Sequence, residues 1–489
     1  MGFITAFHLG SAAVGHSIYR DIHIGTALVY AKGPINLLKP VIVGFNLNGT
    51  PTPQELPVWQ AAAGLAFKMF GAWFGWANLV SLIFMFSCLY PLFNLAERFA
   101  GPDCAWWTLV LFLAQPLIFI YAGEASPDGM SLALSVWFLF FAAKLWEEQK
   151  LKWLVLTGLT GALAAVSKLP FFMAAGLGCF FMTLANFRQQ KPVWVYFGLA
   201  AFFIGAVFLV WTRYVNHCYE KAELPLVDLR ISNDFMKKWY FGDLKYWLSA
   251  SVWVKGAWRI LTSLFGSFAL VALFLVAVVW QSPSRLACWW ILGGLVTTVI
   301  FFHLVLQHAH YYLMLVPGVA ILCAQVAARL EAALLAPGGR RAWLAWLAIM
   351  FALVLSTVQG ALGSHIIYDF DKYPYVIAGT IKQHTSKSDK VVIQGGGWGG
   401  QMLFLAGRNG LSTWTTQLLE NRRTYDRLKE HGFTKLVMVS ESPLLAAIRH
   451  VTSTSPAVDR QSYRENATPI VDTLPTILQT DDILIKELP

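Results

Sequence analysis

Ionisable side chains interrupt the apolar runs of this sequence at several points. In YAGEASPDGM, residues 121–130, the acids Glu124 and Asp128 stand between two runs that are each apolar enough to enter a bilayer. Ionisable residues at membrane depth are costly to bury and commonly functional. Residues of similar chemistry occupy other polar breaks: Arg20, Asp21, His23, Glu55, Lys168, His308, His310 and Tyr311.

These residue types suit a group transfer in which a phosphate leaves. A carboxylate can act as a general base toward an acceptor hydroxyl or amine. Lys168, Arg20 and a histidine can neutralise the charge that develops on the phosphate. A lipid-linked sugar phosphate needs no nucleotide site, and the phosphate-loop pattern GxxxxGKS/T is absent from the chain. The run QGGGWGGQ, residues 394–401, lacks that lysine and spacing, so we interpret it as a strand-to-helix loop.

Each residue also has an interpretation without function. A single acid in a short loop is usually only solvated. Lys168 could extend its ammonium group to the membrane surface, and His308 and His310 could be polar residues at the interface. The collection of acids, a lysine and histidines on one face favours a site over these separate interpretations.

The composition predicts a polytopic α-helical membrane protein. Of 489 residues, 57% are hydrophobic and 13% are charged, whereas soluble domains carry about 25% charged residues. The net charge of +10 then indicates cytoplasmic loops and phosphate or lipid head groups rather than nucleic acid. The six cysteines form no CxxC pair and indicate no disulfide framework.

The apolar runs predict about 11 transmembrane helices in residues 1–364, with a C-terminal soluble α/β domain in residues 365–489. Two long extracytoplasmic loops are expected at 19–72, with surface helices, and at 214–256. The order of KVVIQ, KLVMVS and the intervening helical stretches predicts parallel strands. The expected spans lie near 3–18, 74–96, 104–121, 128–146, 153–167, 169–187, 193–214, 257–280, 287–307, 311–329 and 341–363.

The charges of the short connections orient these spans. Connections rich in lysine and arginine alternate with connections that have almost none, and the first set is expected in the cytoplasm. The candidate site residues and the α/β domain then share the other face, on the periplasmic or extracytoplasmic side of a plasma (inner) membrane. The basic connections contain Arg98, Lys144, Lys150, Lys152, Arg188, Lys191, Arg285, Arg329, Arg340 and Arg341.

Four stretches, in order, resemble the GT-C superfamily of membrane glycosyltransferases. The likeness is to the branch of the protein O-mannosyltransferases and the bacterial lipid A aminoarabinose transferases. The stretches are YRDIHIGTALVYAKGPINLLKP, NGTPTPQELPVWQAAAGLAFKMFG, GEASPDGMSLALSVWFLFFAAKLW followed by GALAAVSKLPFF, and HAHYYLMLVPGVAIL. They extend over residues 19–320, and a soluble tail is usual for the branch.

The resemblance implies roles for the site residues. Asp21 matches the first-loop aspartate, the first candidate for the catalytic base, and Glu55 matches the acid of the second surface helix. Many members carry an Asp-Glu pair in the first loop, whereas this chain has Arg20-Asp21, so the base is either Asp21 or Glu55. The implied substrate-binding residues are Arg20, His23, Glu124, Asp128, Lys168, His310 and Tyr311, of which the last three are expected to face the donor phosphate.

The sequence therefore predicts a glycosyltransferase that moves a hexosyl or pentosyl group from a polyprenyl-phosphate donor to a lipid, glycan or protein acceptor. Inversion at the anomeric carbon is implied by the resemblance. No cofactor is required and no metal is assigned, although Glu124 and Asp128 could share a helix face and hold Mg²⁺ or Mn²⁺.

The alternatives are a secondary transporter and another lipid- or polysaccharide-handling membrane protein, including a polymerase or ligase. A transporter is expected to carry acids inside its helices and often has inverted repeats. Here the acids lie at loop tips, which favours the transferase.

Overall fold

The computed structural model describes residues 17–40, 53–185, 191–221, 230–279, 284–336, 340–365, 373–394, 401–413, 422–440, 474–480 and 483–488. Its contacts divide the chain into two compact units, which we treat separately. The helical unit comprises Met1–Phe7, Ser81–Arg213 and Ile231–Ser364, and the mixed unit comprises His8–Val80, Tyr214–Arg230 and His365–Pro489. The predicted division at residues 364 and 365 stays a prediction.

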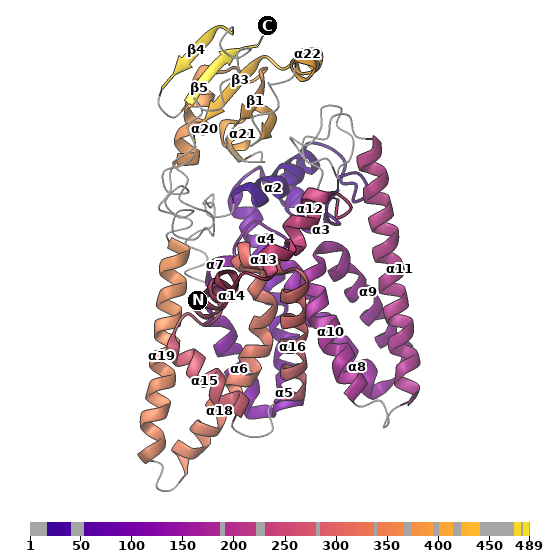
Figure 1. Cartoon of the computed structure of the whole chain (residues 1–489), viewed down its shortest axis with the longest axis vertical. Coiled ribbons are helices and arrows are strands. Elements are labelled where there is room, and N and C mark those ends of the chain that lie inside the picture. The colour runs from indigo at the N-terminus through magenta and orange to yellow at the C-terminus, as the bar shows by residue number, and fades with distance from the viewer. Residues whose placement is uncertain are drawn as a thin grey trace. The chain divides into compact units, whose positions relative to one another are not determined.

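The long helices of the helical unit run roughly side by side (Figure 1). The first of them, α4, begins in the mixed unit, and α11 and α19 end there. The elements are α4 (Phe74–Ser87), α5 (Leu89–Ala100), α6 (Pro102–Leu113), α7 (Pro116–Tyr121), α8 (Asp128–Glu148), α9 (Leu151–Ser167), α10 (Leu169–Ala185), α11 (Lys191–Lys221), α12 (Asp234–Phe241), α13 (Leu244–Trp247), α14 (Ala250–Arg259), η1 (Ile260–Phe265), α15 (Phe268–Val279), α16 (Arg285–Ile300), α17 (Phe302–Gln307), η2 (Ala309–Leu315), α18 (Val316–Leu335) and α19 (Arg340–His365).

Four helices in the described part of the chain are long and apolar enough to cross a membrane: Phe74–Ala100, Asp128–Glu148, Val193–Lys221 and Ala309–Leu335. A fifth span results if Ala250–Phe265 and Leu270–Val279, which meet at 100°, are taken together. The shorter apolar helices are Pro102–Leu113, Leu151–Ser167, Leu169–Ala185, Arg285–Ile300 and Trp346–Leu362. A multi-pass membrane protein is thus confirmed, whereas the number of about 11 spans stays a prediction.

Several predicted spans are broken helices. The span expected at 104–121 ends as α6 at Leu113 and resumes as α7 at Pro116, because a proline has no N–H and clashes with the preceding turn. The predicted span 3–18 lies almost wholly outside the described residues. The long loop expected at 214–256 is largely helical, since α12, α13 and the start of α14 lie within it.

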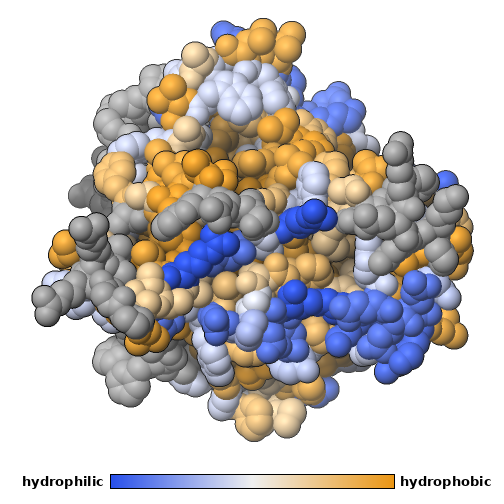
Figure 2. All heavy atoms as spheres, turned by 90° about the horizontal axis from the view of Figure 1, so that it is seen from below, coloured by the Kyte–Doolittle hydropathy of each residue, from blue (hydrophilic) through white to orange (hydrophobic). Residues whose placement is uncertain are grey.

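Figure 2 shows face-on the end of the molecule that lies lowest in Figure 1, and hydrophilic patches lie there between apolar ones. At this end α5 turns into α6 at Gly101 and α8 turns into α9 at Gln149. Arg98 of α5 forms an ion pair with Glu147 of α8, which ties the two turns together. These are connections that the charge pattern assigns to the cytoplasm.

Glycines allow close helix crossings in the helical unit. A Cβ atom on Gly293 of α16 would lie 2.3 Å from the Ala174 carbonyl oxygen of α10, and one on Gly178 would lie 2.9 Å from the Trp290 Cα. Small residues let helix backbones approach in a membrane, where packing rather than the hydrophobic effect drives association. The α10–α16 contact is therefore tight, and it supports the site described below.

The mixed unit contains a helical hairpin of α2 (Ser17–Lys32) and α3 (Val58–Phe70), the surface helices expected within residues 19–72. The helices touch at Gly64, where a Cβ atom would lie 2.6 Å from that of Tyr30. Burial and the neighbouring Tyr214 raise the pKa of Tyr30, so its hydroxyl stays protonated and donates to the Asn36 carbonyl at 2.7 Å.

The same unit contains a five-stranded sheet in the order β2-β1-β3-β5-β4. The central strands β2, β1 and β3 are parallel, as expected, but β5 and β4 add antiparallel strands. The parallel arrangement predicted for KVVIQ and KLVMVS, which are β1 and β3, is therefore confirmed, and β4 and β5 are strands that the sequence did not predict. The strands are β1 (Lys390–Gln394), β2 (Asn409–Thr413), β3 (Lys435–Val439), β4 (Thr476–Gln479) and β5 (Ile483–Glu487).

Helices cover both faces of this sheet. On one face α20 (Tyr373–His384) and α21 (Gln401–Ala406) bury apolar side chains against Ile393. On the other face α22 (Arg422–Glu430) packs against Val392.

Helix α21 also contacts the hairpin region of the mixed unit. The Phe404 ring stacks with Phe67 at 6.3 Å between centroids and meets Phe74 edge-on at 4.7 Å. The Lys32 ammonium donates to the Asn409 side chain at 3.2 Å. The sheet thus supports the hairpin that carries part of the candidate site.

Candidate functional site

A buried ion pair forms the centre of the polar cluster in the helical unit. The Lys168 ammonium contacts the Asp128 carboxylate, and both residues are at most 5% exposed. The Ser126 hydroxyl donates to the second carboxylate oxygen of Asp128 at 2.9 Å. Burial of two opposite charges is tolerated because each neutralises the other and their hydrogen bonds are satisfied.

Local sequence places both charges at helix ends. Asp128 is the first residue of α8, where the helix dipole favours a carboxylate. Lys168 occupies the extended break between α9 and α10, with φ −162°. Its ammonium lies inside the unit, so the interpretation of Lys168 as a lysine that reaches to the membrane surface is wrong.

Aromatic rings and histidines surround this pair. The Lys168 ammonium lies 4.8 Å from the centre of the Tyr311 ring and 5.7 Å from that of Phe171, distances at which a cation is attracted to a ring face. The His310 ring lies 4.4 Å from Tyr311 and 5.9 Å from Tyr121. His310 and Tyr311 are both buried. The structure therefore brings Asp128, Lys168 and Tyr311 together, with His310 beside them.

The short helix η2 carries His310 and Tyr311, and α16 holds it in place. The Trp290 indole N–H donates to the Met314 carbonyl at 3.0 Å, and this side chain is fully buried. Because Gly178 brings α10 close to the Trp290 backbone, the same packing connects η2 with the helix that follows Lys168.

Glu124 lies nearby in sequence but not on a helix. Residues 122–127 form turns, and α8 begins only at Asp128, so the expectation that Glu124 and Asp128 share a helix face is wrong. The reason is Pro127, since the residue before a proline is biased away from the helical region. Glu124 is nevertheless 1% exposed, so it is a buried acid rather than a solvated one.

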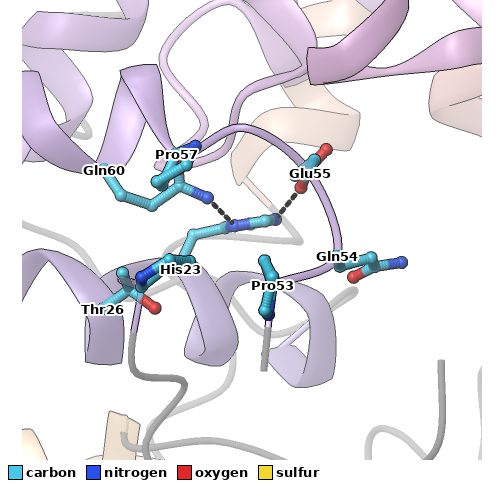
Figure 3. A pocket seen from close by; sticks show the side chains of 8 residues that line it. His23, Thr26, Pro53, Gln54, Glu55, Pro57 and Gln60 are labelled. Carbon is cyan, nitrogen blue, oxygen red and sulfur yellow. Dashed lines mark hydrogen bonds and ion pairs between the residues drawn. The ribbon is translucent and has the colours of Figure 1, made fainter. Parts of the chain in front are cut away.

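A second polar cluster lies in the mixed unit. The His23 imidazole, on α2, has its Nε2 3.2 Å from the Glu55 carboxylate and its Nδ1 2.7 Å from the Gln60 side-chain nitrogen (Figure 3). His23 is 1% exposed, Gln60 4% and Glu55 8%. The three side chains thus form a buried series across the two helices of the hairpin.

Glu55 precedes the helix to which the sequence assigned it. The helix α3 begins at Val58 after Pro57, so Glu55 stands in the turn before its first residue. The turn carries the carboxylate to His23 of α2. Arg20 and Asp21 also belong to α2, but their side chains lie outside the described part of the structure. Gln60 was not singled out from the sequence.

A small cavity adjoins this second cluster. It has room for a single water molecule, about 10 Å³, and is lined by His23, Thr26, Pro40, Pro53, Gln54, Glu55, Pro57 and Gln60. The oxygens of the Gln54 and Gln60 side chains are buried there without a hydrogen-bond partner among the described residues. A group that donates hydrogen bonds would suit this cavity.

Metal ligands do not gather in either cluster. Within the described ranges, no three side chains of histidine, cysteine, aspartate or glutamate lie close enough together to hold an ion. The run at 394–401, interpreted as a loop, lies almost wholly outside those ranges.

Solved structures of other proteins share the fold of this chain. The structure of ArnT from Cupriavidus metallidurans bound to undecaprenyl phosphate aligns with a TM-score of 0.62 at 13% identity, covering 100% of this chain and 96% of that one. Its apo form aligns with a TM-score of 0.59. The arabinofuranosyltransferase AftD from Mycobacteria aligns at 0.55 and 14% identity, over 99% of this chain and 39% of the other. The chain thus has the same fold as these structures.

A match by sequence points to the same class. Residues 52–211 match the family model for dolichyl-phosphate-mannose-protein mannosyltransferases. No curated protein matches the chain by sequence. The predicted resemblance to the GT-C superfamily is therefore confirmed, and the family match indicates a glycosyltransferase.

Proposed function

We propose that this protein is an inverting glycosyltransferase that moves a sugar from a polyprenyl-phosphate donor to a lipid, glycan or protein acceptor. The observation that carries the proposal is the fold, which aligns over the whole chain with that of ArnT bound to undecaprenyl phosphate. The buried cation and aromatic cluster of the helical unit supports it, since a leaving phosphate needs compensation for its charge.

The donor phosphate is assigned to the cluster around Lys168. As the bond between the anomeric carbon and the phosphate oxygen breaks, negative charge grows on the phosphate. A fixed ammonium stabilises this charge more in the transition state than in the ground state, which lowers the barrier. Tyr311 and His310 lie beside Lys168 and can donate hydrogen bonds to the same phosphate.

An apolar groove between α10 and α11 suits the hydrocarbon chain of the donor. It encloses about 450 Å³ and extends from Leu169 to Thr183 along α10, with Trp194 and Phe208 on α11. The rise along the helix from Leu169 to Thr183 is about 21 Å, most of the thickness of a bilayer's hydrocarbon core. Leu169 directly follows Lys168, so the groove begins beside the proposed phosphate position.

The class of donor can be tested directly. Purified protein in nanodiscs should transfer labelled sugar from a polyprenyl-phosphate sugar to membrane or glycan acceptors. It should leave nucleotide sugars unused when no lipid intermediate is present. We also expect activity to survive EDTA, since no metal is proposed for the reaction. Transfer from a soluble nucleotide sugar would contradict the assignment.

The site is assigned to the extracytoplasmic side of the plasma membrane, on the charge asymmetry of the connections. Alkaline phosphatase fused after Pro489 should then be active. A fluorescent reporter that matures only in the cytoplasm should stay dark at the same position. Fluorescence without phosphatase activity would reverse the proposed orientation.

A further inference from the structure

The three short helices α12, α13 and α14, which we call the surface segment (residues 234–259), expose apolar side chains on the helical unit. Leu244, Leu248, Val254 and Trp258 are each between 58% and 76% exposed. Val254 and Trp258 are four residues apart on α14, so they lie on the same face of that helix. Contiguous exposed apolar side chains commonly mark a contact with a membrane or with another molecule.

The opposite face of the surface segment is packed against the helical unit. Val252 of α14 lies in one apolar cluster with Phe302 and Leu306 of α17. A Cβ atom on Gly256 would lie 2.5 Å from the Leu306 Cδ2, so α14 approaches α17 closely. The Trp247 ring stacks on Phe302 at 4.6 Å between centroids. The exposed apolar face therefore belongs to an element that is fixed to the rest of the unit.

The direction of α14 fits a position along a membrane surface. Helix α14 continues into η1, and together they meet Leu270–Val279 at 100°. The second of these helices is part of α15, whose residues are all apolar, FALVALFLVAVV. In a bilayer that contains α15 along its length, α14 lies in the plane of the interface. Figure 1 shows α13 and α14 away from the turn between α8 and α9, at the other end of the unit.

Lysines accompany the apolar side chains of the surface segment. Lys238 of α12, Lys245 of α13 and Lys255 of α14 are exposed, and none forms an ion pair within the described part of the chain. Lys245 follows Leu244, and Lys255 follows Val254. A lysine at such a position can lay its hydrocarbon chain on apolar surface while its ammonium group reaches the lipid head groups.

The two acids of the surface segment do not cancel these charges. Asp234 pairs with the fourth lysine, Lys237, at 3.0 Å. Asp243 caps α13, because its carboxylate accepts from the Tyr246 backbone N–H at 2.7 Å. The net charge of the segment is positive, which complements the phosphate of an anionic lipid.

We propose that the surface segment is an interaction surface for anionic phospholipids. Trp258, Val254 and the two leucines enter the boundary of the acyl region, and the three unpaired lysines hold the phosphates. A bilayer fits this face better than a protein partner does, because the segment continues directly into η1 and the apolar α15. The surface is exposed, unlike the buried cluster around Lys168, and the proposal does not rest on the proposed function.

The charge recognition is tested with the triple variant Lys238→Gln/Lys245→Gln/Lys255→Gln. Each lysine near an anionic surface contributes about fivefold in affinity, so binding of phosphatidylglycerol should weaken about 10²-fold. Native mass spectrometry of the full chain in detergent, titrated with phosphatidylglycerol or phosphatidylcholine, measures the lipid retained. Phosphatidylglycerol should also raise the midpoint of thermal unfolding of the wild type, since a ligand of the folded state stabilises it, and should raise that of the variant much less.

Two further variants serve as controls. Lys238→Arg/Lys245→Arg/Lys255→Arg keeps the charge and should bind phosphatidylglycerol as the wild type does. Lys382→Gln/Lys387→Gln/Lys429→Gln makes the same change of charge at exposed positions of the mixed unit and should leave the affinity within about twofold. The arginine variant decides the test if the glutamine variant fails to fold, because loss of binding in it would contradict recognition by charge.

Three results would overturn the proposal. The first is equal retention of phosphatidylglycerol by the wild type and the glutamine variant. The second is equal retention of phosphatidylcholine and phosphatidylglycerol by the wild type, which would leave only an apolar contact. The third is loss of polyprenyl phosphate binding in the glutamine variant with phosphatidylglycerol binding unchanged, which would assign the lysines to the donor instead.

Discussion

Replacement of Glu55 by glutamine is expected to lower kcat by about 10²–10⁴-fold, the contribution typical of a general base. The amide is nearly isosteric and can stay at the position of the carboxylate, which lies 3.2 Å from the His23 Nε2. It cannot take a proton from the acceptor. Donor binding should therefore survive, measured by native mass spectrometry or by photocrosslinking with a polyprenyl-phosphate analogue.

The matched variant is Asp21→Asn, since the sequence places Asp21 first among the candidate bases. If Glu55 is the base, Asp21→Asn should reduce turnover less than Glu55→Gln. If Asp21→Asn were inactive and Glu55→Gln active, Asp21 would be the catalytic base instead of Glu55. Near-normal turnover in both variants would contradict the proposed base-assisted glycosyl transfer. A transporter or a lipid-handling protein would then be the better interpretation.

Composition and apolar pattern predicted the class of fold because burial in a membrane requires long apolar helices with internally satisfied backbones. The pattern could not show where those helices break. Apolar residues continue through Pro116 and Phe301, yet α6 and α16 end just before them. Such breaks depend on backbone chemistry and on tertiary packing, which a hydropathy pattern does not record.

The charged members of the site were visible in the sequence, but their partners were not. Asp128 and Lys168 are 40 residues apart, and their contact exists only because α8 and α10 pack together. An acid and a lysine in separate loops give no sign that they pair. The sequence therefore named Asp128 and Lys168 as separate substrate-binding residues and predicted no contact between them, whereas the structure pairs them.

Gln60, unlike Asp128 and Lys168, was not singled out by the sequence analysis. It is an amide in the apolar stretch VWQAAAGLAF, which has no charge to attract attention. The available hint was helical phase: a polar side chain on the face of α3 that meets α2 needs a partner there. Identifying His23 as that partner required the register between the two helices, which Gly64 sets by its contact with Tyr30.

The Asp128–Lys168 pair leads to the second large effect, on stability. In Lys168→Met the Asp128 carboxylate stays buried without its counter-charge, and removal of one partner of a buried pair costs about 3–5 kcal/mol. The double variant Asp128→Asn/Lys168→Met removes both charges and should recover most of this loss. The midpoint of thermal unfolding in detergent measures each variant. Lys150→Met, at an exposed pair with Glu148, should change it little.

Activity separates the structural role of this pair from its proposed catalytic one. If the Lys168 ammonium stabilises the leaving phosphate, the double variant should be stable yet remain slow, because the charge that the transition state needs is gone. Lys168→Arg should keep part of the activity, since the charge persists with altered geometry. A double variant that is both stable and fully active would show that the pair only holds α8 against α10. The donor phosphate would then have to be assigned to His310 and Tyr311 without it.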